Sequence, residues 1–194
     1  VVGAPLYDVQ TPSSDDGKAF VFLGTATGLS TSAAWTATTL SQSSMFGYSV
    51  ASAGDVNGDG YGDVVVGAYR YSSGASSRGR ADLYLGSSAG LSPYAAWSVY
   101  PGGTDANFGM SVASAGDVNG DGYGDVAVGA PAVTGGSGST GRVYLYLGSA
   151  GGLSGTASRL LESPQGGAAF GRSVASAGDV NGDGFGDVVS GAHK

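Results

Sequence analysis

The sequence of 194 residues contains no cysteine and a single histidine, and only 12% of its residues are charged. Without cysteine the chain has no disulfide, no thiol nucleophile and no cysteine-ligated zinc site. No apolar run approaches the ~20 residues that a membrane-spanning helix needs. An apolar content of 41% excludes an intrinsically disordered chain. The 8 basic residues are outnumbered by 15 acidic ones, and this net charge of −7 argues against nucleic-acid binding.

Glycine is the residue in excess, with 38 of 194 positions, far above the usual ~7%. The glycines follow no three-residue period, which excludes collagen. The chain instead repeats itself with a period of 62 residues. The segment FGYSVASAGDVNGDGYGDVVVGA at residues 46–68 returns nearly unchanged at 108–130 and 170–192. Copies this similar indicate recent duplication or deliberate construction.

Two further blocks keep the same spacing. One reads GKAFVFLGTATGLS in its first copy, and the copies begin at Gly17, Gly79 and Gly141. The other ends in Trp35 and Trp97, whereas Arg159 stands at the third position. The chain begins in the middle of a repeat, and no signal peptide is visible, so we expect an excised fragment.

One repeat predicts four β-strands and no helix, because no window shows a 3.6-residue apolar stripe. The predicted strands are Phe46–Ala53, Asp63–Ala68, Arg80–Leu85 and Tyr94–Tyr100. The first alternates large and small residues with a period of two. Four antiparallel strands per repeat favour the blades of a β-propeller, and a β-sandwich or irregular barrel is the alternative. We therefore expect an all-β fold, one domain over residues 1–194 with about three blades.

Three blades are too few to close a ring, because propellers have at least four. The predicted strand order gives a first blade without its inner strand and a last blade with two inner strands only. A head-to-tail homodimer would form a six-bladed ring with twofold symmetry. The alternative is a fragment that closes with blades it does not contain.

Acidic side chains are concentrated in one repeated loop. Nine of the fifteen lie in three copies of a nonapeptide, at residues 55–63, 117–125 and 179–187. Positions 1, 3, 5 and 9 carry oxygen-bearing side chains, position 7 offers a backbone carbonyl, and glycines at 4, 6 and 8 permit a tight curl. Carboxylates this close repel one another unless a cation lies among them. An all-oxygen set with irregular coordination suits Ca²⁺ better than Mg²⁺.

The EF-hand shares part of this pattern but does not fit. Its twelfth position should be a bidentate glutamate, and Val66, Val128 and Ser190 stand there. Strands rather than helices flank the loop, which also excludes dockerin-type calcium modules. An aspartate-rich turn without metal is the remaining alternative.

Three motifs follow one another in the repeat: Phe-Gly, then D-x-N-x-D-G-x-x-D, then Gly-Ala-Pro at 3–5 and 129–131. This succession resembles the FG-GAP repeat of integrin α-subunit β-propellers and their bacterial relatives. The resemblance covers essentially the whole chain. It implies that the Phe-Gly strand is innermost and that three Ca²⁺ ions bind at one rim. The implied ligands are Asp55, Asn57, Asp59, Tyr61 (carbonyl) and Asp63; Asp117, Asn119, Asp121, Tyr123 (carbonyl) and Asp125; and Asp179, Asn181, Asp183, Phe185 (carbonyl) and Asp187.

Two features depart from that family. The proline of Gly-Ala-Pro is replaced by Tyr69 and His193 in the other two copies. The family's propellers have seven blades, whereas this chain holds about three.

The expected function is a calcium-stabilised interaction or adhesion module, extracellular or on a cell surface, that binds a protein or glycan. The lack of cysteine is compatible with a bacterial source. No enzyme is expected, because the only histidine, His193, lies next to the C-terminal residue and the acids outside the loops share no repeat position. The alternatives are a carbohydrate-binding propeller that uses Trp35 and Trp97, and a structural or designed piece without a ligand.

Overall fold

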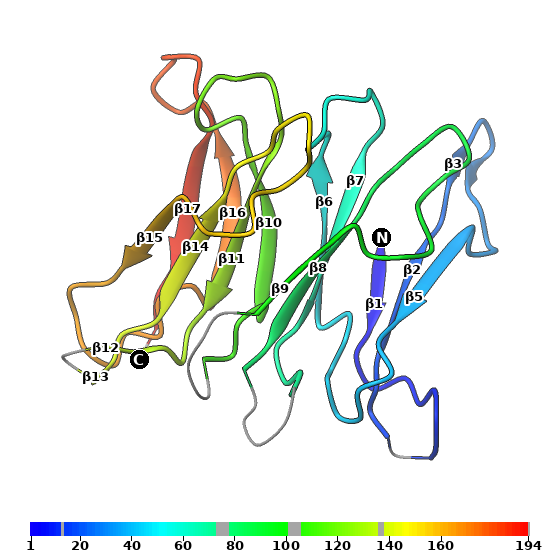
Figure 1. Cartoon of the computed structure of the whole chain (residues 1–194), viewed down its shortest axis with the longest axis horizontal. Coiled ribbons are helices and arrows are strands. Elements are labelled where there is room, and N and C mark those ends of the chain that lie inside the picture. The colour runs from blue at the N-terminus through cyan, green and yellow to red at the C-terminus, as the bar shows by residue number, and fades with distance from the viewer. Residues whose placement is uncertain (13, 73–77, 101–105, 136–137, 194) are drawn as a thin grey trace.

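Short strands joined by glycine-rich turns make up the whole of the computed structural model, which describes residues 1–12, 14–72, 78–100, 106–135 and 138–193. No helix occurs in those segments, and accordingly none that is long and apolar enough to cross a membrane. Figure 1 shows the strands gathered into sheets that stand side by side along the longest axis. The all-β prediction is confirmed.

Two sheets are complete four-stranded antiparallel blades. The first has the order β6 (Ser49–Gly54), β7 (Asp63–Ala68), β8 (Arg80–Tyr84) and β9 (Trp97–Val99). The second has the order β10 (Ser111–Gly116), β11 (Asp125–Ala130), β14 (Arg142–Tyr146) and β15 (Arg159–Glu162). Each strand pairs with the next along the chain, as the repeat predicts. A short hairpin, β12 (Thr134–Gly135) with β13 (Gly138–Ser139), interrupts the second blade.

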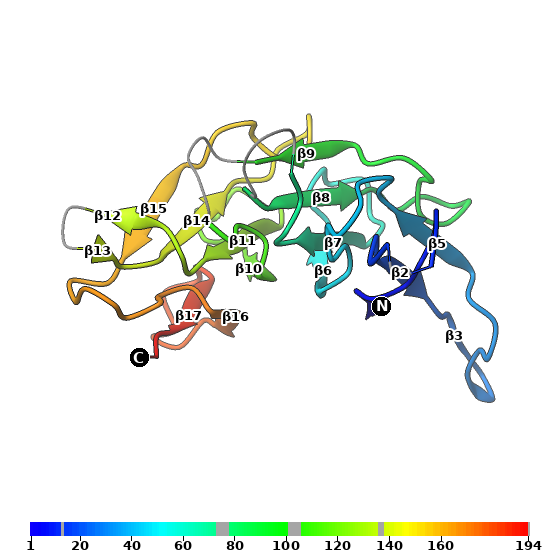
Figure 2. The ribbon, with the colours of Figure 1, turned by 90° about the horizontal axis from the view of Figure 1, so that it is seen from below.

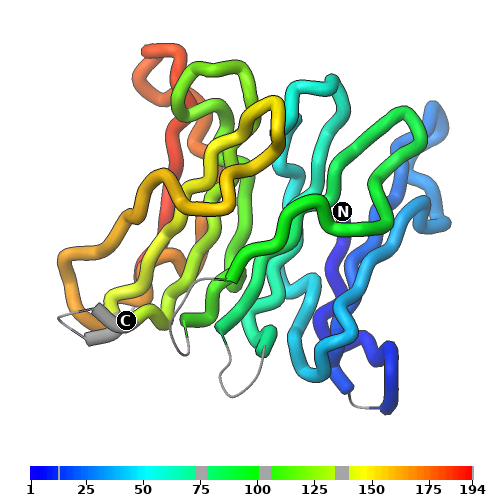
Figure 3. The backbone as a smooth tube through the Cα atoms, in the orientation of Figure 1, coloured from blue at the N-terminus to red at the C-terminus, as the bar shows by residue number. Residues whose placement is uncertain are grey.

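The two outer sheets are incomplete. The first contains β1 (Val2–Ala4), β2 (Lys18–Val21) and β5 (Trp35–Thr38), with a hairpin of β3 (Gly24–Thr25) and β4 (Gly28–Leu29) between them. The last contains β16 (Ser173–Gly178) and β17 (Asp187–Gly191). The tube in Figure 3 follows this order from blue to red. The predicted order of three strands, two quartets and two strands is confirmed.

The Phe-Gly strand is the inner strand of each blade. β6, β10 and β16 are neighbours along one side of the molecule, seen from below in Figure 2, with β9 and β15 on the opposite side. The Ser49 hydroxyl on β6 donates to the carbonyl of Gly109 in the next blade (2.8 Å). Ser111 makes the same bond to Gly171 (2.8 Å). A hydrogen bond from each inner strand therefore ties successive blades together.

The second strand ends in Gly-Ala because the neighbouring blade leaves no room for a side chain. A Cβ on Gly67 would lie 2.0 Å from the carbonyl oxygen of Gly109, and one on Gly129 would lie 1.9 Å from that of Gly171. These distances are far below van der Waals contact. The glycine of the motif thus permits the blades to pack at this spacing.

The predicted boundaries were wrong for three of the four strands of a repeat, and only Asp63–Ala68 was right at both ends. The inner strand was predicted to start at Phe46, but β6 begins at Ser49 because Gly47 turns the backbone at φ +79°. Phe46 instead forms an isolated parallel bridge with Gly17 and buries its ring completely. The fourth strand is shorter than Tyr94–Tyr100, and the third ends at Tyr84.

Candidate metal centre

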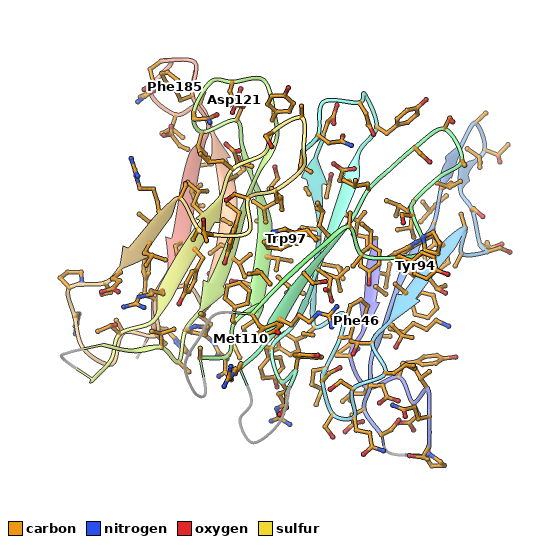
Figure 4. The ribbon with its side chains drawn as sticks, in the orientation of Figure 1. Phe46, Tyr94, Trp97, Met110, Asp121 and Phe185 are labelled. Carbon is orange, nitrogen blue, oxygen red and sulfur yellow. The ribbon has the colours of Figure 1, made fainter. Side chains whose placement is uncertain are left out.

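The three aspartate loops lie at the same rim. Each connects the inner strand of a blade to the second strand, β6 to β7, β10 to β11 and β16 to β17. In Figure 1 all three project from the same end of the blades, and Figure 4 labels Asp121 and Phe185 there. This is the arrangement that the resemblance implied.

Backbone N–H groups of its own loop surround Asp55. Its carboxylate accepts hydrogen bonds from the N–H groups of Gly58 (2.7 Å), Asp59 (3.1 Å) and Gly60 (2.7 Å). Both glycines have positive φ, +72° and +87°, so the curl depends on them. The Gly60 N–H, with the others, lowers the pKa of the Asp55 carboxyl below its usual value. The first ligand position is thus held as a charged carboxylate.

Asp63, at the ninth position, anchors the loop to the blade. Its side chain is only 1% exposed and accepts from the N–H groups of Val56 and Gly86, both at 2.8 Å. Burial raises its pKa, and the negative charges of Asp59 and Asp55 raise it further. The carboxylates of one loop therefore repel one another across the predicted site.

The other two loops repeat this geometry. Asp117 accepts from Gly120 and Gly122, and Asp179 accepts from Gly182 and Gly184, all at 2.7–2.9 Å. At the ninth position, Asp125 accepts from Val118 and Gly148, and Asp187 accepts from Val180. The three loops are three copies of one structure, closed by their own nine residues.

Neighbouring loops also touch, which the sequence reasoning missed. A Cβ on Gly58 would lie 2.7 Å from the Tyr123 ring, and one on Gly120 would lie 2.7 Å from the Phe185 ring. The N–H of the glycine after each ring donates to the first residue of the preceding loop, Gly124 to Asp55 (2.8 Å). The signal was present in the sequence, since every copy has glycine at position 4 and an aromatic residue at position 7.

The donor set fits a hard cation, although it is not a ready-made cage. Within the described ranges, no three or more His, Cys, Asp or Glu side chains converge as a metal site. The loops offer carboxylate, amide and carbonyl oxygens, the ligands that Ca²⁺ prefers. In this structure Asn57 contacts Asp59 twice: its amide nitrogen donates to Asp59 Oδ2 (2.9 Å), and its Oδ1 accepts from the Asp59 N–H (3.3 Å).

The tryptophans considered for sugar binding lie between blades. Trp35 is 9% exposed, contacts the Tyr84 ring at 4.8 Å, and donates from Nε1 to the Ser92 carbonyl (2.8 Å). Trp97 makes the equivalent contacts: its ring lies 4.9 Å from that of Tyr146, and its Nε1 donates to the Ser154 carbonyl (2.9 Å). Both rings take part in packing against the next blade, which does not favour a role in stacking on sugars.

Comparison with known proteins agrees with this architecture. The FG-GAP repeat family matches residues 46–84, 108–146 and 170–193, more than half of the chain. The chain is similar to integrin alpha-IIb of Mus musculus (39% identical over 158 residues) and of Homo sapiens (40% over 158), and to integrin alpha-PS5 of Drosophila melanogaster (38% over 154). These alignments cover 76–77% of this chain but about 15% of each integrin. The chain belongs to the FG-GAP repeat family.

Proposed function

We propose that this chain is part of a calcium-stabilised propeller that acts as an extracellular or cell-surface adhesion or protein-interaction module. The observation that carries the proposal is the row of three identical oxygen-rich loops on one rim, in a chain similar to integrin alpha subunits. Loops of this kind in extracellular modules bind Ca²⁺ at roughly 10⁻⁴–10⁻³ M. Millimolar extracellular calcium would fill them.

In each loop the proposed ligands are the side chains at positions 1, 3, 5 and 9 and the carbonyl at position 7. Calcium would supply positive charge among carboxylates that otherwise repel one another. Burial raises the pKa of Asp63 most, and the charges of Asp59 and Asp55 raise it further. The chain's own residues orient these groups: backbone N–H groups hold Asp55, and Asp63 fixes the loop to the turn after β8. The role of calcium is thus to stabilise the rim.

Removing one loop carboxylate tests the proposed ligands. Asp121→Ala should abolish binding at the second loop and reduce the calorimetric stoichiometry from three Ca²⁺ to two. The other sites should remain because each loop is closed by its own hydrogen bonds. A modest weakening of the third site is expected, since the Phe185 ring rests on Gly120 of the altered loop.

Glu162→Gln is the matched control, because it removes one negative charge outside the loops and should leave three sites. Loss of all calcium binding in Asp121→Ala would contradict the proposal that each loop binds its own ion. An unchanged stoichiometry would exclude Asp121 as a ligand.

A protein ligand is favoured over a sugar bound by the tryptophans, because Trp35 and Trp97 pack between blades. Specificity is expected in the variable loops at 6–16, 69–78 and 132–140. Residues 13, 73–77 and 136–137 of these loops lie outside the described part of the chain. The immobilised chain should retain one or more members of a panel of purified extracellular-matrix proteins in 1 mM Ca²⁺ and release them in chelator. Capture that chelator does not change would contradict a calcium-dependent adhesion module.

We also propose that a second copy covers the outer blades, giving a head-to-tail dimer with six blades. What supports this is that the first and last blades carry the same contact groups as the internal interfaces, without their counterparts. Val56 is 0% exposed and its carbonyl accepts from Ser149 (3.0 Å), whereas the equivalent Val180 is 71% exposed. Such apolar exposure favours association.

A further inference from the structure

Asp82 breaks the repeat in the middle of a blade. It lies on β8, where the equivalent positions carry Phe20 on β2 and Tyr144 on β14. Its cross-strand neighbour Ser98 on β9 is also polar, whereas Leu160 on β15 faces Tyr144. In a chain that repeats so closely, one blade thus exchanges an aromatic residue for a carboxylate.

This carboxylate is buried with half of its hydrogen-bonding capacity unused. Asp82 is 1% exposed. Its Oδ1 accepts from Arg80 Nε (2.7 Å) and from the Ser98 hydroxyl. Its Oδ2 has no hydrogen-bond partner within the described residues. Buried polar atoms in folded proteins are nearly always paired, so this carboxylate oxygen calls for a partner that the described residues do not supply.

A cleft of about 400 Å³ lies at this carboxylate, between the first two blades. It is lined by Thr38, Thr39, Leu40, Ser41, Tyr71, Arg80, Asp82 and Tyr84. At the next interface the Tyr144 ring takes the place of Asp82 and contacts Phe108 at 5.2 Å. The shorter aspartate therefore leaves space that an aromatic ring fills elsewhere, within the range of roughly 300–1,000 Å³ usual for small-molecule sites.

The cleft is separate from the aspartate loops. Thr38 ends β5 and Arg80 begins β8, and both strand ends lie at the rim opposite the loops in Figure 1. Phe46, labelled in Figure 4, flanks the same interface, with its ring 6.5 Å from that of Tyr84. A ligand here would not compete with calcium.

The charges around the cleft select the class of ligand. Arg80 balances Asp82, so a cation would meet Arg80 and an anion would meet Asp82. Arg80 donates to Asp82 Oδ1 and to Ser98, and it also contacts Tyr71, whose ring centroid lies 4.9 Å from the guanidinium carbon. Its remaining N–H groups are the donors on this wall of the cleft. Hydroxyl groups both donate and accept, and the aromatic side chains of Tyr71 and Tyr84 line the same cleft.

We propose that this cleft binds a small neutral polyhydroxyl compound, of the size of one sugar ring, through Asp82 and Arg80. In this site Asp82 Oδ2 accepts from a ligand hydroxyl, and the Arg80 guanidinium donates to a neighbouring oxygen. This inference goes beyond the adhesion function and does not depend on it.

Saturation-transfer NMR on the 194-residue chain tests the site, with 1 mM Ca²⁺ present throughout. The neutral probes are glucose, galactose, mannose, N-acetylglucosamine and inositol, and the charged probes are arginine methyl ester and putrescine. One or more neutral probes should bind. Affinity should fall at least tenfold in Asp82→Asn, which replaces an acceptor by a donor, and in Asp82→Tyr/Ser98→Leu, which restores the residues of the next blade.

Glu162→Gln is the matched control, because Glu162 pairs with Arg142, the equivalent of Arg80 in the next blade. It should bind as the unaltered chain does. The proposal is overturned if no neutral probe binds, if the charged probes bind instead, or if Asp82→Tyr/Ser98→Leu binds equally well. A chain that failed to bind three Ca²⁺ ions would contradict the calcium proposal but would not change the expected binding of neutral probes. The two proposals can therefore fail independently.

Thermal unfolding gives a second readout. Asp82→Tyr/Ser98→Leu removes a buried carboxylate with an unpaired oxygen, so its Tm should rise by roughly 2–6 °C. A rise in Tm on replacement is typical of residues that serve binding at a cost in stability. A lower Tm would show that Asp82 serves the fold, and would overturn the proposal.

Discussion

Removing calcium from the 194-residue chain is expected to lower its Tm by roughly 8–16 °C. The proposed three sites, if independent and with a Kd of about 10⁻⁴ M in about 1 mM Ca²⁺, would stabilise the folded state by roughly 1.4 kcal/mol each, or about 4 kcal/mol together. Three bound ions also change the formal charge from −7 to −1. The measurement is a thermal melt in calcium and in chelator at equal ionic strength.

The charge distribution makes this the largest effect expected on stability. Three loops of like charge stand at one rim, and the rings of Tyr123 and Phe185 hold each loop against the preceding one. The control is Asp59→Ala/Asp121→Ala/Asp183→Ala, in which each loop loses its fifth position and chelator should no longer shift the Tm. A Tm that chelator leaves unchanged in the unaltered chain would contradict the calcium proposal.

The fold was predictable because the sequence repeats closely enough for each copy to support the same strand assignment. A segment that returns every 62 residues is expected to form the same strands each time. The acidic loop and the glycine-rich turns predict connections, and the β-branched run Asp63–Ala68 predicts a strand. The position of the three loops on one rim follows directly from this repetition. The alternation of residues along one strand does not show which part of the neighbouring blade covers each face of that strand.

Where the structure differs from the sequence-based expectation, the common cause is a contact with the neighbouring blade. Phe46 continues the large-small alternation of the inner strand, yet Gly47 turns the chain and the ring enters the interface between blades. Tyr84 alternates with apolar residues as an exposed strand face would, yet it is buried because Trp35 and Ala37 of the first blade pack on it. Strand periodicity reports on local structure, whereas these residues are determined by the adjacent blade.

In calcium, the 194-residue chain is expected to have a mass about twice the 18.8 kDa of one copy. The two outer faces carry halves of the contact that joins the internal blades. A Cβ on Gly58 or Gly120 would meet the ring of the following loop, whereas Gly182 has no atom within 4 Å of that position. At the other end, Tyr61 is 43% exposed, without an earlier loop beneath it. In the proposed dimer, the loop at 179–187 of a second copy would lie beneath Tyr61, as the loop at 55–63 lies beneath Tyr123.

The same docking would complete the first blade. It contains β1, β2 and β5 and lacks an inner strand, which β16 of a second copy can provide. A cavity of about 440 Å³ beside it, lined in part by Leu23, Trp35, Tyr61 and Leu91, gives Val180 an apolar seat. β17 occupies the same place in a blade as β1, and with five residues against three we expect it to displace β1. Two such contacts close a six-bladed ring with twofold symmetry.

Light scattering coupled to size-exclusion chromatography measures the mass, and one substitution isolates the interface. Val180→Lys should shift the chain to a single copy, because burying an unpaired ammonium in the apolar cavity opposes docking. Tyr94→Lys is the control, since Tyr94 is 80% exposed and the equivalent Thr156 stays exposed at the intact interface of the two complete blades, and it should remain dimeric. A mass near 18.8 kDa for the unaltered chain would refute the dimer. A dimer that Val180→Lys leaves intact would place the interface elsewhere.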